Sequence, residues 1–197
     1  RPASANFRGM SLRVARGGRR VAPAAPTCGS PRCGAAPVKT ALYILAGILV
    51  LALVLVQLGV LSGSRPADLG VSKGRLKPPS PTPNSVSSQA GLYPDHPQRE
   101  YALIQPLPLR GSASASMQAL AAVLAAMPGI TVVEQRPDYL YAQATTRWLK
   151  FTDDLEFWFD PARGAIELRS ASRLGGKDFG VNRQRIEAIR AAYLAQL

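Results

Sequence analysis

Three carboxylates lie within four residues of one segment, at Asp153, Asp154 and Glu156. Metal-dependent hydrolases cluster acids in this way, because hard cations need several oxygen ligands. The surrounding residues predict a strand, in which Asp154 and Glu156 share a face and Asp153 points to the other. Glu156 is expected to face Arg169 across a hairpin, so ion pairing is the favoured interpretation. Metal-assisted hydrolysis by the three carboxylates is kept as the alternative, and we assign neither a metal site nor a catalytic residue.

Basic, hydroxyl and amide side chains gather between the end of the next strand and the start of the last helix. Glycines, hydroxyls and cations that converge at a helix N-terminus are typical of an anion site. Gly176 and Lys177 are followed by Asp178, so the segment is not a nucleotide-binding phosphate loop. The alternative is a buried polar corner, in which these side chains satisfy backbone groups where the chain turns. The candidate set for an anion, a lipid headgroup or a partner is Arg169, Ser170, Ser172, Arg173, Lys177, Asn182 and Arg183.

The composition excludes several classes of site. The 197 residues contain one His and two Cys, too few for a metal site or a nucleophilic triad that needs several of either. Cys28 and Cys33 form at most half of a zinc site. His96 lies between Asp95 and Pro97, where a solvated side chain is expected. No cofactor is expected, and a non-enzymatic role is favoured over an enzymatic one.

The formal net charge of +12 is concentrated near the N-terminus. Residues 1–39 carry eight basic residues and no acid, whereas residues 65–197 carry 16 bases and 12 acids. The first segment is rich in Gly, Pro and Ala without hydrophobic periodicity, which predicts a basic disordered leader and not a nucleic-acid-binding arm. Translation from Val38 would leave this leader out, and Met10 is another candidate start. No nucleic-acid partner is expected.

Residues 41–61 contain no charge, and Gln57 is their one strongly polar side chain. At about 1.5 Å per residue the run spans roughly 31 Å, which matches the hydrocarbon core of a bilayer. A cleaved signal peptide is the alternative, but its apolar region would be shorter and no good small-residue cleavage site follows. We therefore predict a transmembrane helix over residues 40–61, with the lipid bilayer as a partner. Lys39 and the long domain that follows favour the orientation with the C-terminal domain outside the cytoplasm.

Residues 62–97 contain seven prolines together with many Ser and Gly. Such a composition cannot bury enough apolar area to order itself, so it predicts an extended linker. Its part 81–89 could instead dock on the folded domain.

Residues 98–197 are expected to form an α+β domain, a small antiparallel sheet with helices packed on it and preceded by the single transmembrane helix. Apolar residues repeat at helical spacing at 117, 120, 124 and 127, and again at 186, 189, 193 and 197. Pro128 and Gly129 are expected to end the first helix, and Asn182 is the expected N-cap of the second. The runs 130–134 and 139–145 predict strands.

Residues 154–160 and 165–171 predict a β-hairpin closed by a four-residue turn. The apolar and charged side chains separate onto two faces in one register, and a slip by one residue would mix them. Trp158 then falls on the polar face, where it is expected to cover Arg169 or to mark a partner surface. The expected pairs are Asp160–Ala165, Phe159–Ile166, Trp158–Glu167, Phe157–Leu168 and Glu156–Arg169.

Several strings of the chain occur together in one known family: residues 77–88, 139–142, 151–160, 166–175 and 178–186. On these strings, residues 65–197 resemble the domain of unknown function 1499 (DUF1499), found in bacteria and in plastid-bearing eukaryotes. The resemblance implies a transmembrane helix just before the domain and supports a start near Val38. For a bacterial member of this family, the expected location is the bacterial inner membrane. It implies no catalytic residue. Ser85 stands where the family's Pro-Asn-Cys-Val-Ser string has its Cys, so no thiol chemistry is expected.

The favoured function is therefore a binding or accessory module, displayed by a single-pass membrane protein to a membrane-associated protein partner. The predicted anchor, the linker and the lack of a convincing catalytic set motivate this hypothesis. It predicts that Glu156 is paired with Arg169, whereas a metal hydrolase would need the carboxylates exposed in a cleft with their oxygens converging.

Overall fold

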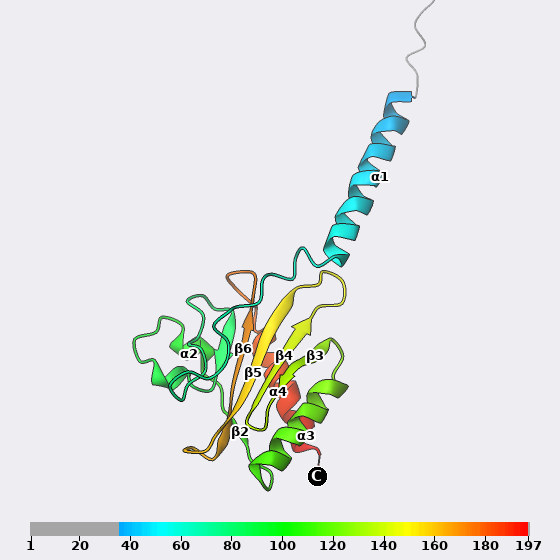
Figure 1. Cartoon of the computed structure of the whole chain (residues 1–197). Helices are drawn as coiled ribbons and strands as arrows, with labels where there is room; N and C mark the ends of the chain where they lie inside the picture. The colour runs from blue at the N-terminus through cyan, green and yellow to red at the C-terminus, as the bar shows by residue number, and fades with distance from the viewer. Residues whose placement is uncertain (1–35, 197) are drawn as a thin grey trace, which may run out of the picture. The chain divides into compact units, whose positions relative to one another are not determined.

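A computed structural model describes residues 36–196 of the chain (Figure 1). Most of the predicted leader lies outside these described residues, as do Met10, Cys28, Cys33 and Leu197. Residues 36–39, predicted as the end of the leader, are helical.

Helix α1 (Ala36–Gln57) contains most of the apolar run, and both of its ends differ from the prediction. It begins before residue 40 because Pro37 is tolerated in the first turn of a helix, where its missing N–H is not needed. It ends before residue 61 because Gly59 adopts a φ of +82° and the amide of Val60 donates to the carbonyl of Leu55 (3.3 Å). From residue 37 onward it is the one described helix long and apolar enough to cross a membrane.

The folded domain is built on a six-stranded antiparallel sheet with helices α3 (Ala113–Ala126) and α4 (Val181–Leu194) on one face (Figure 1). The strand order is β1-β6-β5-β4-β3, and β2 also pairs with β6. This arrangement confirms the predicted α+β class. The remaining elements are β1 (Ser85–Ser87), the short helices η1 (Ala90–Leu92) and α2 (Arg99–Ala102), β2 (Leu107–Pro108), β3 (Ile130–Gln135), β4 (Tyr139–Thr145), β5 (Thr152–Asp160) and β6 (Ala165–Ser172).

The predicted hairpin register is confirmed by the β5–β6 pairing, including Phe157 opposite Leu168 and Glu156 opposite Arg169. The turn closes where the amide of Gly164, at a φ of +60°, donates to the carbonyl of Asp160 (2.9 Å). Because side chains alternate along a strand, this register sends the apolar residues of β5 and β6 toward the helices and most charged ones to the other face.

The main core lies between the helices and the sheet, as the helical spacing predicts. Ser112 caps α3 by accepting a hydrogen bond from the amide of Ala115 (3.1 Å), and the helix ends just before Pro128 and Gly129. Leucine, isoleucine and aromatic side chains from both layers are completely buried here. They include Leu120, Leu124, Leu140, Leu155, Phe157, Ile166, Leu168, Ile186, Ile189 and Tyr193.

The prediction that residues 62–97 form an extended linker is wrong for most of this segment. Leu76 and Val86 are each 1% exposed, and β1 pairs with β6. Leu76 packs on the sheet face opposite the helices, together with Tyr139, Tyr141 and Trp158. The proline-rich segment cannot form a core by itself. It is ordered because it pairs with the free edge of β6 and packs on the aromatic side chains of β4. The docking alternative for 81–89 therefore describes the structure, and the ordered domain begins well before residue 98.

Candidate functional site

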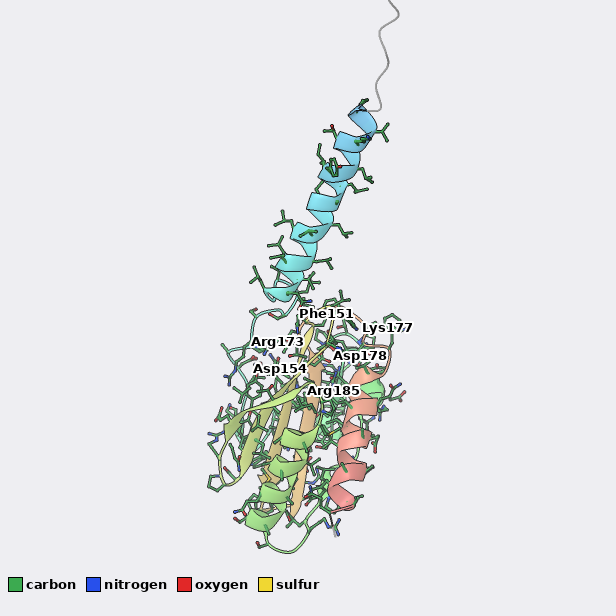
Figure 2. All side chains as sticks on the ribbon, turned by 90° about the vertical axis from the view of Figure 1, so that its right-hand side faces the viewer. Phe151, Asp154, Arg173, Lys177, Asp178 and Arg185 are labelled. Carbon is green, nitrogen blue, oxygen red and sulfur yellow. The ribbon has the colours of Figure 1, made fainter. Side chains whose placement is uncertain are left out.

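The polar side chains singled out in the sequence divide between the two faces of strands β5 and β6. On the face opposite the helices lie Asp154, Glu156 and Arg169, joined by Arg173 just beyond the end of β6. On the helix side, Asp153 contacts α4 through Arg185. Figure 2 shows the side chains of Asp154, Arg173 and Arg185 near the same end of the sheet.

The first pair on the open side of the sheet joins Arg173 to Asp154. Nη2 of Arg173 lies 2.7 Å from Oδ1 of Asp154, and Nε lies 3.0 Å from Oδ2. The Tyr141 hydroxyl donates to Asp154 Oδ1 (2.6 Å) and accepts from Arg173 Nη2 (3.1 Å). The hydrogen bonds to Asp154 raise the pKa of Arg173, so this guanidinium stays charged. The two side chains are only 6% and 2% exposed, so the pair is largely shielded from water.

The second pair joins Arg169 to Glu156 deeper on the same face. Their nearest nitrogen and oxygen are 3.6 Å apart, and both residues are almost completely buried. Glu156 Oε1 accepts hydrogen bonds from the amide of Gly70 (2.6 Å) and the hydroxyl of Tyr139 (2.9 Å). Burial raises the pKa of Glu156 and lowers that of Arg169, because both charged forms lose hydration. The other oxygen of Glu156, Oε2, accepts no hydrogen bond from the described residues and has Arg169 as its charge partner.

A cavity of about 480 Å³ lies above these pairs, between the sheet and the segment 64–82. Its floor includes Asp154, Arg169, Ser172 and Arg173, and its walls come from the proline-rich segment. Among the charged wall residues, Lys77 lies 2.6 Å from Asp68, a contact that lowers the pKa of that carboxyl. The lining is therefore nearly balanced in charge, which suits a polar or zwitterionic group better than a strong anion.

Asn84 lies at the edge of this cavity and leaves one buried oxygen without a partner among the described residues. Its side chain lines the cavity, the residue is 7% exposed, and Nδ2 donates to the carbonyl of Gly175 (2.6 Å). Oδ1 is buried and receives no hydrogen bond from the described residues. A buried polar atom without a partner is costly, so this oxygen is an exception among the buried polar groups of the domain.

A separate buried polar corner lies on the helix side, at the start of α4. Ser170 Oγ donates to Asn182 Oδ1 (2.5 Å), and Asn182 Nδ2 donates to Ser172 Oγ (3.0 Å). Asp178 accepts from the amides of Gly180 (3.0 Å) and Asn182 (3.2 Å), and also from the hydroxyl of Tyr101. Burial alone would raise the pKa of Asp178, but these hydrogen bonds outweigh it and lower the pKa. Gly180, at a φ of +84°, is the N-cap residue of α4, so the prediction of Asn182 as the cap is wrong.

The three predicted carboxylates do not form one cluster. Asp153 pairs with Arg185 (2.6 Å), while Asp154 and Glu156 take separate arginines on the opposite face. No group of three or more His, Cys, Asp or Glu among residues 36–196 could hold a metal ion. The alternative of metal-assisted hydrolysis is therefore not favoured.

The predicted ligand set is likewise spread over several places. Arg169, Ser172 and Arg173 line the cavity, whereas Ser170 and Asn182 belong to the buried corner. Two further members lie elsewhere. Arg183 Nη2 donates to the carbonyls of residues 101 (2.6 Å) and 103 (3.0 Å), and Lys177 lies in the exposed β6–α4 loop.

The sequence patterns did not predict that the tyrosines of β4 pack on the second face of the sheet, or that the segment 64–82 forms a cavity wall there. Tyr139 and Tyr141 alternate with apolar residues along β4, and this period of two was the available signal for a second packed face. Trp158 packs with them under Leu76 and is 8% exposed, so it marks no free surface. The predicted stacking of Trp158 on Arg169 is not found among the described residues. The arginines that lie over rings of this group are Arg65, 4.2 Å from the centre of Tyr141, and Arg136, 4.5 Å from the centre of Tyr139.

Comparison with known proteins identifies a family for this domain. Residues 75–193, more than half of the chain, match the family model described as "Protein of unknown function (DUF1499)". No curated protein and no solved structure matches the chain. The matched region runs from before β1 to the last turn of α4, and leaves out α1.

Proposed function

The chain belongs to the DUF1499 family, and on that basis we propose that it is a single-pass membrane protein whose folded domain is a binding or accessory module for a membrane-associated partner. The proposal places α1 across a bacterial inner membrane and the C-terminal domain outside the cytoplasm. It assigns the domain no reaction of its own.

The observation that carries the proposal is the uncovered apolar helix. None of the most apolar part of Pro37–Gln57 is buried against the rest of the protein. Its 21 residues extend roughly 31 Å at about 1.5 Å per residue, enough for the hydrocarbon core of a bilayer. An apolar helix of this length is unfavourable in water, and the hydrocarbon core of a bilayer would shield it. Lys39 at its N-terminal end supports the orientation with that end in the cytoplasm.

The pairing of the charged side chains supports a binding role over a catalytic one. A general base or nucleophile must reach its substrate, whereas Asp154 and Glu156 are buried and held by arginines and tyrosines. The cavity above them is polar and nearly balanced in charge. These properties favour holding a polar segment of a partner without transforming it.

Site-specific photo-crosslinking of the full chain in its native membrane tests the proposal. A photoreactive amino acid at Thr82, an exposed residue of the cavity wall, should give one discrete adduct with a membrane-associated protein. The matched control is the same amino acid at Ala122, an exposed position on α3. Identical adducts from both positions, or none from Thr82, would contradict the binding role.

A further inference from the structure

The loops at one end of the sheet carry an exposed group of aromatic, apolar and basic side chains. The β4–β5 loop and the β6–α4 loop meet here, because Asp153 pairs with Ser172 and the amide of Arg173 donates to the carbonyl of Thr152 (3.4 Å). We define the aromatic-basic patch as Arg147, Trp148, Leu149, Phe151, Lys177 and Phe179. Figure 2 shows Phe151 and Lys177 at this end of the sheet.

The apolar members of the patch are unusually exposed for their size. Trp148 is 72% and Phe179 80% exposed, and Leu149 and Phe151 are 49% and 37% exposed. Such a group is costly in water, and large exposed apolar groups mark interaction surfaces. Phe179 also holds a φ of +54°, a conformation that bulky residues rarely adopt. Its side chain is thus displayed on a strained backbone without gaining burial in the domain.

The charges of the patch are positive and have no carboxylate partner. Arg147 and Lys177 lie over the rings of Trp148 and Phe179, at 5.2 and 5.6 Å, and neither forms an ion pair within residues 36–196. Asp153, at the start of β5, and Asp178, in the β6–α4 loop, are buried and already bonded to other groups. The patch therefore presents a net positive, aromatic surface.

The length of the chain limits how far this end can lie from α1. The carbonyl of Gly63 accepts a hydrogen bond from Arg173 (3.2 Å), so the segment after α1 is fixed to the domain at the end that carries the patch. Gly63 lies six positions after Gln57, the last residue of α1. Six residues span at most about 20 Å when fully extended. If α1 crosses a bilayer, the patch end of the domain stays close to the lipid headgroups.

We infer that the aromatic-basic patch contacts the surface of the membrane in which α1 is anchored, with the aromatic rings in the interfacial region and the cations on anionic headgroups. This inference rests on the membrane anchorage proposed above. Trp side chains favour the interface because one part of the ring system is apolar and the other donates a hydrogen bond. Basic residues add attraction to anionic lipids. The contact would limit the orientations that the domain can adopt relative to the membrane.

Fluorescence of the full chain, reconstituted in phosphatidylcholine–phosphatidylglycerol vesicles with brominated acyl chains, tests the contact. The chain has two tryptophans, and Trp158 is buried in the domain, so the difference between the wild-type and Trp148→Phe signals reports Trp148. The Trp148 component should lose most of its intensity in brominated lipid, and the Trp158 component should not change. Lys177→Glu should restore much of the lost intensity. The matched charge reversal Arg136→Glu, in the β3–β4 turn at the other end of the sheet, should not.

Two outcomes would overturn the inference, and they differ. If the chain resists alkaline washing of the vesicles but Trp148 is not quenched, the helix is an anchor and the patch does not touch lipid. The patch would then be expected to bind a partner protein instead of lipid. If alkaline washing releases the chain, the proposed anchorage fails and the membrane contact fails with it.

Discussion

Replacing Arg173 by methionine is expected to destabilise the domain by about 3–5 kcal/mol, the range found when one partner of a buried ion pair is removed. Three nitrogen–oxygen contacts of 2.7 to 3.1 Å join Arg173 to Asp154, and Asp154 is 2% exposed. After the replacement, this carboxylate would keep the hydrogen bond from Tyr141 (2.6 Å) but would lose its counter-charge. The carbonyl of Gly63 would also lose its donor, so the attachment of the segment after α1 would weaken.

A double-mutant cycle separates the ion pair from general damage. The variant Arg173→Met/Asp154→Leu removes both charges, and it should recover a large part of the stability lost in Arg173→Met, because no buried charge is left alone. Arg173→Lys should fall between wild type and Arg173→Met. A lysine keeps the charge but cannot form the paired contacts of a guanidinium.

Thermal unfolding of the full chain in nanodiscs, followed by tryptophan emission, measures these differences. A loss of about 3–5 kcal/mol corresponds to a fall in Tm of roughly 6–20 °C for a domain of this size. A loss below about 1 kcal/mol is the value for an exposed pair and would refute the reasoning from burial. Equal losses for Arg173→Met and the double variant would show that packing, and not the charge pair, sets the stability.

The remaining predictions concern the start of α4 and one turn. The wild-type domain should be more stable than Asp178→Asn at neutral pH, and this difference should shrink as the pH falls below the ordinary carboxyl pKa of 3.8. The reason is that the pKa of Asp178 is lowered in the folded state, so its contribution to stability is present above pH 3.8 and is lost when the carboxylate is protonated. Denaturant unfolding of both proteins across this pH range measures the difference. Gly129→Ala should cost about 1–3 kcal/mol, since Gly129 has a φ of +77° and an added Cβ would lie 2.9 Å from the carbonyl of Thr145. Gly91→Ala, where no atom lies within 4 Å of the added Cβ and φ is not positive, should leave Tm nearly unchanged.

The sheet and its helices were predictable because local patterns decide them. The alternation in β5 and β6 allows one register, and that register brings Glu156 and Arg169 together as expected. The helical spacing around Leu120 and Ile186 identifies the two helices that cover one face. In each case the deciding residues lie within a few positions of one another in the sequence.

The second face of the sheet was not predictable in this way. Leu76 and the residues next to it pack on this face, but they lie more than 60 residues before Tyr139 and Tyr141, in a segment with the composition of a linker. Nothing local indicates which segment docks there. The pairing of Asp154 with Arg173 has the same cause, because the partner lies beyond the end of β6, where strand register no longer applies.

The position of the helix start shows a third limit. Asn182 has a side chain typical of an N-cap, but it lies inside α4, in the buried corner with Ser170. Asp178 binds the free amides instead, because Gly180 turns the chain at a φ of +84° and brings this carboxylate under the helix end. Both residues satisfy the rules for capping, and packing decides between them.

The central claim is that Pro37–Gln57 anchors this domain in a membrane. Alkaline extraction of membranes that contain the full chain tests it most directly, combined with a measurement of the intact mass of the protein that stays in the membrane. We predict that the chain stays in the membrane pellet with the helix still attached, and that Leu49→Arg combined with Val50→Arg moves it to the supernatant, because each arginine at the centre of a spanning helix costs about 2.5–3.5 kcal/mol. A wild-type chain released by alkali, or a mass that lacks the helix because it has been cleaved as a signal peptide, would contradict the account.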